Sequence, residues 1–123
     1  QLTAICFLKV KSVDFWAFYG CSQLSKVFLP LCEELGYGCF VECEKIKILY
    51  LPKVKSVGNQ SFWGCKSLTD LIIPLVEKIG GDCFRCCDSL ESIDSKLEAN
   101  QFKCDDWCKQ NKKCVICRGK LEE

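Results

Sequence analysis

The chain has 123 residues, with 17 Lys and Arg against 16 Asp and Glu and a net charge of +1. This length allows one domain at most, and so balanced a charge gives no reason to expect a nucleic-acid or membrane surface. Although 49% of the residues are hydrophobic, no apolar run reaches the roughly 18 residues that a membrane span needs, so we expect no span within this chain.

One pattern of residue types recurs every 22 residues. Phenylalanine fills one column of this repeat, cysteine a second, proline a third, and glycine a fourth, in which Asp14 stands in the first copy. A chain without repeats gives no reason for so many columns to keep one register. The columns are Phe18, Phe40, Phe62 and Phe84; Cys21, Cys43, Cys65 and Cys87; Pro30, Pro52 and Pro74; and Gly36, Gly58 and Gly80.

Within one copy, the residues up to Pro52 alternate as in a short strand. Leu49 and Leu51 are expected to point inward and Tyr50 outward, because successive side chains of a strand point to opposite faces. Pro52 ends the strand, since proline cannot donate a hydrogen bond to a ladder.

The second half of the copy contains another short extended stretch and a turn. Val54 and Val57 are expected to pack inward. Gly58 follows where the chain must turn, and we expect it to adopt a positive φ, which glycine tolerates. Phe62 and Cys65 lie three residues apart, which fits one turn of a 3₁₀- or α-helix.

Stacked copies can bury apolar columns that a single copy leaves exposed, at about 4.8 Å per strand. At least about three copies are needed for stability. We therefore predict a solenoid of short parallel β-strands with loops and short 3₁₀ or helical turns, formed by about four 22-residue repeats in residues 1–95. Residues 96–123, in which Asn100-Gln101-Phe102 is similar to part of a shortened copy, are predicted to form a degenerate terminal repeat and a cysteine-rich cap or tail.

The string LP-x-V-x-x-V-G-x-x-x-F-x-x-C-x-x-L-x-x-L resembles the BspA-type leucine-rich repeat, from about Leu8 to Ile93. The family's usual copy is slightly longer and has Ala before the Phe, where two copies of this chain have Cys39 and Cys83. The resemblance implies a leucine-rich-repeat solenoid and an adhesin-like role in protein–protein recognition, at the cell surface or secreted. The cysteine-rich version resembles the members of this family in protists.

Thirteen cysteines raise the question of thiols or disulfides. Six of them fill two repeat columns, and Ala17 and Ser61 occupy the second column in other copies, which implies a small buried position. Stacked Cα atoms about 4.8 Å apart would permit a disulfide, but parallel Cβ vectors keep the Cβ atoms farther apart than the ~3.8 Å of real bridges. We therefore predict buried thiols, which suit a reducing compartment such as the cytoplasm.

Four more cysteines follow in the tail with the spacing C-x₃-C-x₅-C-x₂-C. Four thiolates suit a tetrahedral structural zinc ion, two disulfides would suit a secreted cap, and the third possibility is ordinary cysteines in a loose tail. The spacing matches no known zinc finger, and the chain has no His to complete a mixed site. The candidate ligands are Cys104, Cys108, Cys114 and Cys117, and no other cofactor is expected.

The sequence lacks the usual combinations of catalytic residues. Without His there can be no Cys–His nucleophile pair. No Gly-rich phosphate loop, nucleophile elbow or pair of carboxylates at a defined spacing is present. The sequence therefore predicts a non-enzymatic module that binds another protein, not nucleic acid.

The outward positions of the first strand are the best candidates for contact with that partner. One outward column holds Cys6, Phe28, Tyr50 and Ile72, and beside it run Ala4, Lys26, Ile48 and Asp70. Aromatic anchors are typical of interfaces, although such residues also simply favour strands. The predicted binding residues are Phe28, Tyr50, Ile72, Ile48, Lys26 and Asp70.

Another outward column alternates in charge from copy to copy, as Lys11, Glu33, Lys55 and Glu77. In a parallel stack these residues would form a ladder of opposite charges. A charged docking strip is one interpretation, but a net-neutral ladder has no steering field. We therefore predict that the ladder sets the order of the copies, and a Glu33 far from both Lys11 and Lys55 would mean that the register is wrong.

The chain contains no Met and begins at Gln1 in the middle of a repeat, so we expect a fragment or a processed chain. Its localisation stays open between the cell surface or secretion, which the resemblance implies, and the cytoplasm, which reduced cysteines would suit. An intracellular scaffold and a structural zinc module are the alternatives to the adhesin-like role.

Overall fold

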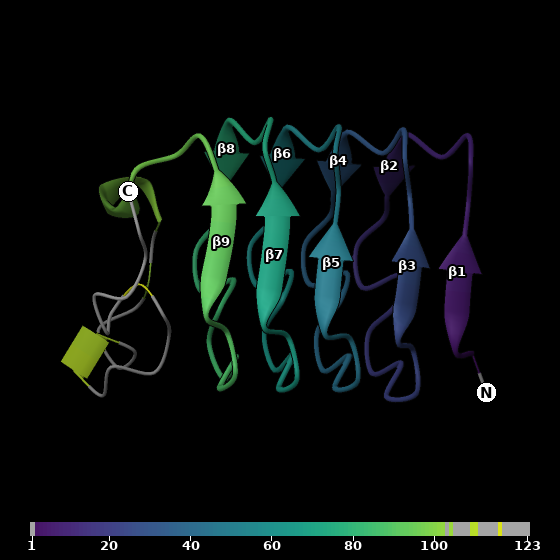
Figure 1. Cartoon of the computed structure of the whole chain (residues 1–123), viewed down its shortest axis with the longest axis horizontal. Coiled ribbons are helices and arrows are strands. Elements are labelled where there is room, and N and C mark those ends of the chain that lie inside the picture. Colours follow the sequence, from purple (N-terminus) through teal and green to yellow (C-terminus); the bar gives the residue numbers. More distant parts are fainter. Residues whose placement is uncertain (1, 103, 105–108, 111–115, 117–123) are drawn as a thin grey trace.

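The computed structural model describes residues 2–102, 104, 109–110 and 116, and two rows of short strands run along one axis (Figure 1). The front row holds β1 (Ala4–Cys6), β3 (Lys26–Phe28), β5 (Ile48–Tyr50), β7 (Asp70–Ile73) and β9 (Ser92–Ser95). The second row holds β2 (Ser12–Val13), β4 (Glu34–Leu35), β6 (Ser56–Val57) and β8 (Lys78–Ile79). The chain alternates between the rows, so each of the first four coils contributes one strand to each row, and the coil of β9 contributes one to the front row.

Strands one period apart pair in parallel, as the 22-residue spacing predicts. In the front row Leu49 lies opposite Leu71, and Leu71 opposite Ile93. In the second row Leu35 lies opposite Val57. The predicted solenoid and its register are confirmed. The front row consists of two sheets, β1-β3 and β5-β7-β9, because no ladder joins β3 to β5 among the described residues.

The core is a set of stacked columns in which like side chains meet. The Phe40 and Phe62 rings are fully buried, with centroids 6.3 Å apart and planes 6° apart. Phe18 stacks on Phe40 at 5.5 Å, and Phe84 on Phe62 at 5.8 Å. Phe102 then covers Phe84 at 5.9 Å, tilted by 55°. The 3₁₀-helix η1 (Ala99–Gln101) immediately precedes Phe102.

The glycine column has a different cause from the one predicted. Positive φ at Gly58 was expected, but Gly58 is not among the residues with positive φ. A Cβ atom at Gly58 would instead lie 2.6 Å from the backbone nitrogen of Tyr37 and 2.7 Å from the carbonyl carbon of Gly36. Glycine is needed here because the backbone of the preceding coil passes too close for any side chain.

Positive φ occurs at two other columns, and it changes the structure predicted around Phe62. Gln60 has a φ of 60° and Gly64 a φ of 78°. The Cys65 N–H donates to the Phe62 carbonyl at 3.1 Å, so Gly64 is the third residue of a β-turn that needs a left-handed conformation there. The expected helical turn is thus wrong for this segment, which forms β-turns. No helix in the described part of the chain is long and apolar enough to cross a membrane.

The alternating charge column keeps its predicted place but not its predicted pairing. The Glu33 N–H donates to the Lys11 carbonyl at 2.7 Å, and the Lys55 N–H donates to the Glu33 carbonyl at 2.8 Å, so the register is right. Among the described side chains, however, no ion pair joins members of this column, and Glu77 instead contacts Lys96 at 3.6 Å. The ladder prediction was wrong because side chains on neighbouring coils need not turn toward each other.

Candidate interaction surface

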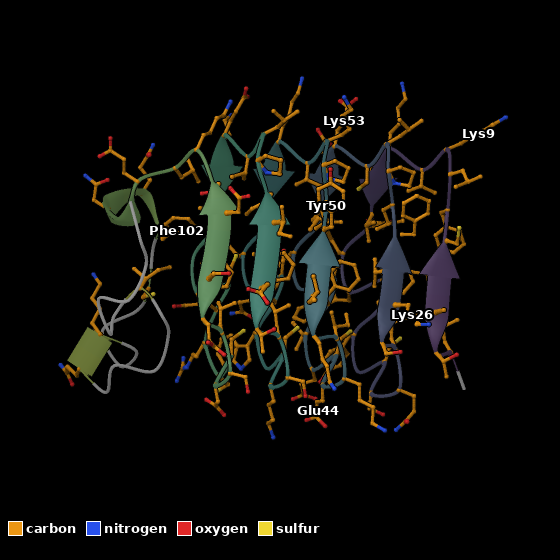
Figure 2. All side chains as sticks on the ribbon, viewed as in Figure 1. Lys9, Lys26, Glu44, Tyr50, Lys53 and Phe102 are labelled. Carbon is orange, nitrogen blue, oxygen red and sulfur yellow. The ribbon has the colours of Figure 1, made fainter. Side chains whose placement is uncertain are left out.

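Strand alternation exposes one face of the front row, which we call the strand face and define as the outward side chains of β1, β3, β5, β7 and β9. In β5 the Leu49 side chain is buried, while Ile48 is 60% and Tyr50 51% exposed. Phe28 in β3 is 50% exposed. Figure 2 shows Tyr50 extending from β5 and Lys26 from β3. Large apolar side chains therefore meet water on neighbouring strands.

The strand face changes in chemistry along the stack. Phe28, Ile48 and Tyr50 make its middle apolar, with the exposed Lys26 beside them. Toward the C-terminal end it becomes acidic, through Asp70 in β7 and Asp94 in β9. The face thus combines an apolar centre with a basic side and an acidic side.

Asp70 is oriented by its own chain. The Ser92 hydroxyl donates to one carboxylate oxygen at 2.6 Å, and the Thr69 hydroxyl donates to the other at 3.0 Å. These hydrogen bonds, the one from Ser92 foremost, lower the pKa of the Asp70 carboxyl, because they favour its charged form. Asp70 therefore presents a fixed negative charge on the strand face.

All six predicted binding residues lie on the strand face. Ile48 is the register partner of Asp70, and Tyr50 is the partner of Ile72, which is half-buried. Lys26 and Phe28 lie on β3, beside β5 in Figure 1. The structure thus brings the six together, and their role in binding stays a prediction. Sequence reasoning missed Ser92, although its 22-residue distance from Asp70 was a usable signal.

The cysteine columns serve the interior instead of this surface. The Cys65 thiol donates to the Phe40 carbonyl at 3.2 Å, and the Cys87 thiol donates to the Phe62 carbonyl at 3.0 Å. Ser61 and Cys83 make the equivalent bonds to glycine carbonyls of the preceding coil. These thiols and this hydroxyl link successive coils.

Burial favours the protonated form of cysteines in these columns. It raises the pKa of Cys43 and of Cys83 to about 12, because an apolar environment penalises the thiolate. Of the six cysteines predicted to be buried thiols, Cys21 is half-buried and the rest are buried, and none of the six forms a disulfide. Cys6, by contrast, is an exposed free thiol on the strand face.

The tail prediction falls largely outside the described residues. Cys104 is described and half-buried, whereas Cys108, Cys114 and Cys117 are not among the described positions. Within the described ranges, no group of three or more His, Cys, Asp or Glu residues is placed to hold a metal ion. A structural zinc ion on the four cysteines remains a prediction.

A shallow groove over the second row of strands was not singled out from the sequence. It runs across β2, β4 and β6, and Gly36 and Gly58 are among its lining residues. The glycine column was the signal that could have located it. Its lining residues include Ser12, Asp14, Glu34, Tyr37, Ser56 and Asn59.

Comparison with known proteins agrees with this architecture. The model of the BspA type leucine-rich repeat region matches residues 1–112, in six copies. The chain belongs to the BspA-type leucine-rich repeat family. A search of curated proteins gives no match.

Two solved structures are similar to this chain in fold. A leucine-rich repeat protein from Bacteroides ovatus is 32% identical over 75% of this chain, with a TM-score of 0.71. A leucine-rich cell surface protein from Faecalibacterium prausnitzii A2-165 is 23% identical over 80% of this chain, with a TM-score of 0.56. The chain spans only 24% of the first protein and 34% of the second, so the likeness covers a part of each.

Proposed function

We propose that this chain is a non-enzymatic protein–protein recognition module and that the strand face is its binding surface. The observation that carries the proposal is the exposure of Phe28, Ile48 and Tyr50 by half or more on neighbouring strands. Aromatic side chains are enriched among the residues that dominate binding energy. Membership of a leucine-rich repeat family supports the same role, because solenoids offer extended surfaces for partners.

Within this proposal the six residues have different tasks. Phe28 and Tyr50 act as the anchors that a partner surrounds, and Ile48 and Ile72 extend the apolar contact. Lys26 and Asp70 lie beside these anchors and select a partner by charge, because rim charges affect specificity and association rate more than affinity.

The module could act at the cell surface or inside the cell, and whether its cysteines are reduced or oxidised distinguishes these two settings. The matched Faecalibacterium prausnitzii protein is a cell surface protein, which supports an adhesin-like setting for this chain. The absence of disulfides among the cysteines of the repeat columns supports the alternative, an intracellular scaffold. Thiol counting in denatured protein from its source, together with metal analysis, distinguishes these two settings. Thirteen thiols without metal favour the scaffold, and oxidised tail cysteines favour export. One zinc ion per chain would favour the third alternative, a structural zinc module.

The binding role is tested by capture of partners from an extract of the cells that make the chain. The variant Phe28→Ser/Ile48→Ser/Tyr50→Ser removes the apolar centre of the strand face. The matched control Phe15→Ser/Tyr19→Ser removes two aromatic side chains that are equally exposed but lie outside it. We expect the control to retain the proteins that the unmodified chain captures and the triple variant to lose them. Capture of the same proteins by the triple variant would overturn the proposal.

A further inference from the structure

The outward residues of the strand face are arranged symmetrically about β5, although the 22-residue repeat does not require this. On either side of β5, the neighbouring strands carry complementary residues at equivalent positions of the 22-residue repeat. Lys26 in β3 and Asp70 in β7 share one column, and Phe28 and Ile72 share the next. The central strand carries Ile48 in the first of these columns and Tyr50 in the second. The face is therefore complementary to itself about β5.

A two-fold rotation about an axis along β5 would use every element of this pattern. It reverses the order of the strands while keeping each column at its height, so β3 of one copy faces β7 of the other. Lys26 then meets Asp70 twice, and Phe28 meets Ile72 twice. Ile48 and Tyr50 meet their own counterparts at the axis, as in an isologous interface. An axis along the stack would instead place each strand on its own counterpart, so Lys26 would meet β3 of the second copy and not Asp70.

We propose that the partner of the strand face is a second copy of this chain, bound across a two-fold axis along β5. This inference rests on the proposed recognition role of the face and names its partner. Opposite charges that meet on the two sides of an apolar centre fix the orientation of such a contact.

The state of the charged residues suits this arrangement. Asp70 is held by Ser92 and Thr69, and a carboxylate with about four acceptor sites can still receive an ammonium group. Lys26 is exposed, and no described residue forms an ion pair with it. Lys47, exposed at the start of β5, would meet its counterpart near the axis, but its flexible stem lets the charge turn to water.

The size of the face sets the strength of the dimer. Five strands about 4.8 Å apart, each three or four residues long, form a small surface. Interfaces that bury less than about 1,200 Å² in total are typical of weak and transient complexes. The expected dimer is therefore in concentration-dependent exchange with the monomer.

Charge reversal with complementation tests this dimer. The full chain would be studied by sedimentation equilibrium with a reductant, which prevents disulfides through the exposed Cys6. Lys26→Glu alone and Asp70→Lys alone each create two like-charged pairs, and we expect self-association to weaken at least about tenfold. An equimolar mixture of the two variants creates only opposite pairs and should restore the dimer. The matched controls Lys55→Glu and Asp88→Lys reverse exposed charges outside the strand face and should dimerise like the unmodified chain.

Two results would overturn the inference. One is an unmodified chain that stays monomeric at every concentration, and the other is a dimer that Lys26→Glu leaves unchanged. If the chain is monomeric but the serine triple variant still loses its captured partners, the recognition role stands and only self-association falls. A photo-crosslinking residue in place of Tyr50 gives an independent readout, because in the proposed dimer it links to Ile48 or Tyr50 of the second copy.

Discussion

The two sides of the front strands follow different rules. On the inward side, Leu49 and Leu71 repeat one residue type and are buried by the coils on either side. On the outward side, Phe28, Tyr50 and Ile72 differ from coil to coil and contact water to different extents. Regular stacking thus restricts one side and leaves the other free to vary. In this solenoid, stability resides on the inward side of the short strands, and the proposed recognition on their outward side.

The sharpest contrast is between two aromatic residues of similar size, Phe40 inside and Tyr50 outside. Phe40→Ala leaves a cavity between two stacked rings, and we expect the free energy of unfolding to fall by about 3–5 kcal/mol. Tyr50→Ala should change it by no more than about 0.5 kcal/mol. Urea denaturation followed by circular dichroism measures both. Equal losses would remove the distinction between the two sides.

The buried thiols predict a loss of stability in alkali. The pKa of Cys83 is raised from 9.0 to about 12 in the folded chain, so above pH 9 the unfolded state releases a proton that the folded state retains. The stabilisation is full below pH 9 and declines up to about pH 12, by about 1.4 kcal/mol per pH unit for this thiol. Urea midpoints between pH 8 and 11 measure the decline, to which Cys43 also contributes.

Cys83→Ser is the control for this titration. Ser61 occupies the equivalent position one coil earlier and donates to the Gly36 carbonyl at 3.1 Å, so serine fits the site without an ionising thiol. We expect a shallower decline with pH in this variant. A urea midpoint that is constant up to pH 11 would show that these cysteines are not buried, protonated thiols.

A pair of glycines tests how tightly the coils stack. Gly58→Ala brings a Cβ atom to 2.6 Å from the backbone of Tyr37, and we expect a loss of about 1–3 kcal/mol in the free energy of unfolding. A Cβ atom at Gly81 meets nothing within 4 Å, so Gly81→Ala should be neutral or slightly stabilising, by up to about 1 kcal/mol. Thermal denaturation of the two variants compares them. A harmless Gly58→Ala would mean that the coils lie farther apart.

The smallest effect belongs to the surface ion pairs. Lys66 contacts Glu44 at 3.5 Å, and both side chains are largely exposed. Lys66→Ala should lower the free energy of unfolding by no more than about 0.5 kcal/mol, and less in high salt. Urea titrations at low and high ionic strength measure this loss, and Lys45→Ala is the control, because Lys45 is exposed and forms no ion pair with a described residue. A loss of several kcal/mol would show that charge contributes to holding the coils together.

The sequence predicts this molecule well where identical residues must meet, and poorly where the detailed geometry of the backbone and side chains decides. The 22-residue columns predicted the pairing of Leu49 with Leu71 and the stacking of Phe40 on Phe62, because burial demands like side chains at every coil. The reason for Gly58 could not be predicted, since a close backbone approach depends on three-dimensional spacing. Positive φ at Gln60 was missed because only one residue of that column, Gly38, is a glycine.

The candidate site shows the same division. Alternation along β5 was enough to predict that Tyr50 faces outward. The hydrogen bonds that hold Asp70 required the side-chain positions of Thr69 and Ser92. The ion pair expected between Glu33 and its lysine neighbours failed for the same reason, since a column places a residue on a coil but does not direct its charged group.

The most direct test of this account is a nuclear Overhauser measurement on the folded chain with labelled phenylalanine. Coils that lie one over another place the Phe40 and Phe62 rings with centroids 6.3 Å apart, so cross-peaks should join their ring protons and continue to Phe18 and Phe84. A folded chain without a Phe40–Phe62 cross-peak would contradict the stacked coils, and with them the continuous strand face on which both proposals depend.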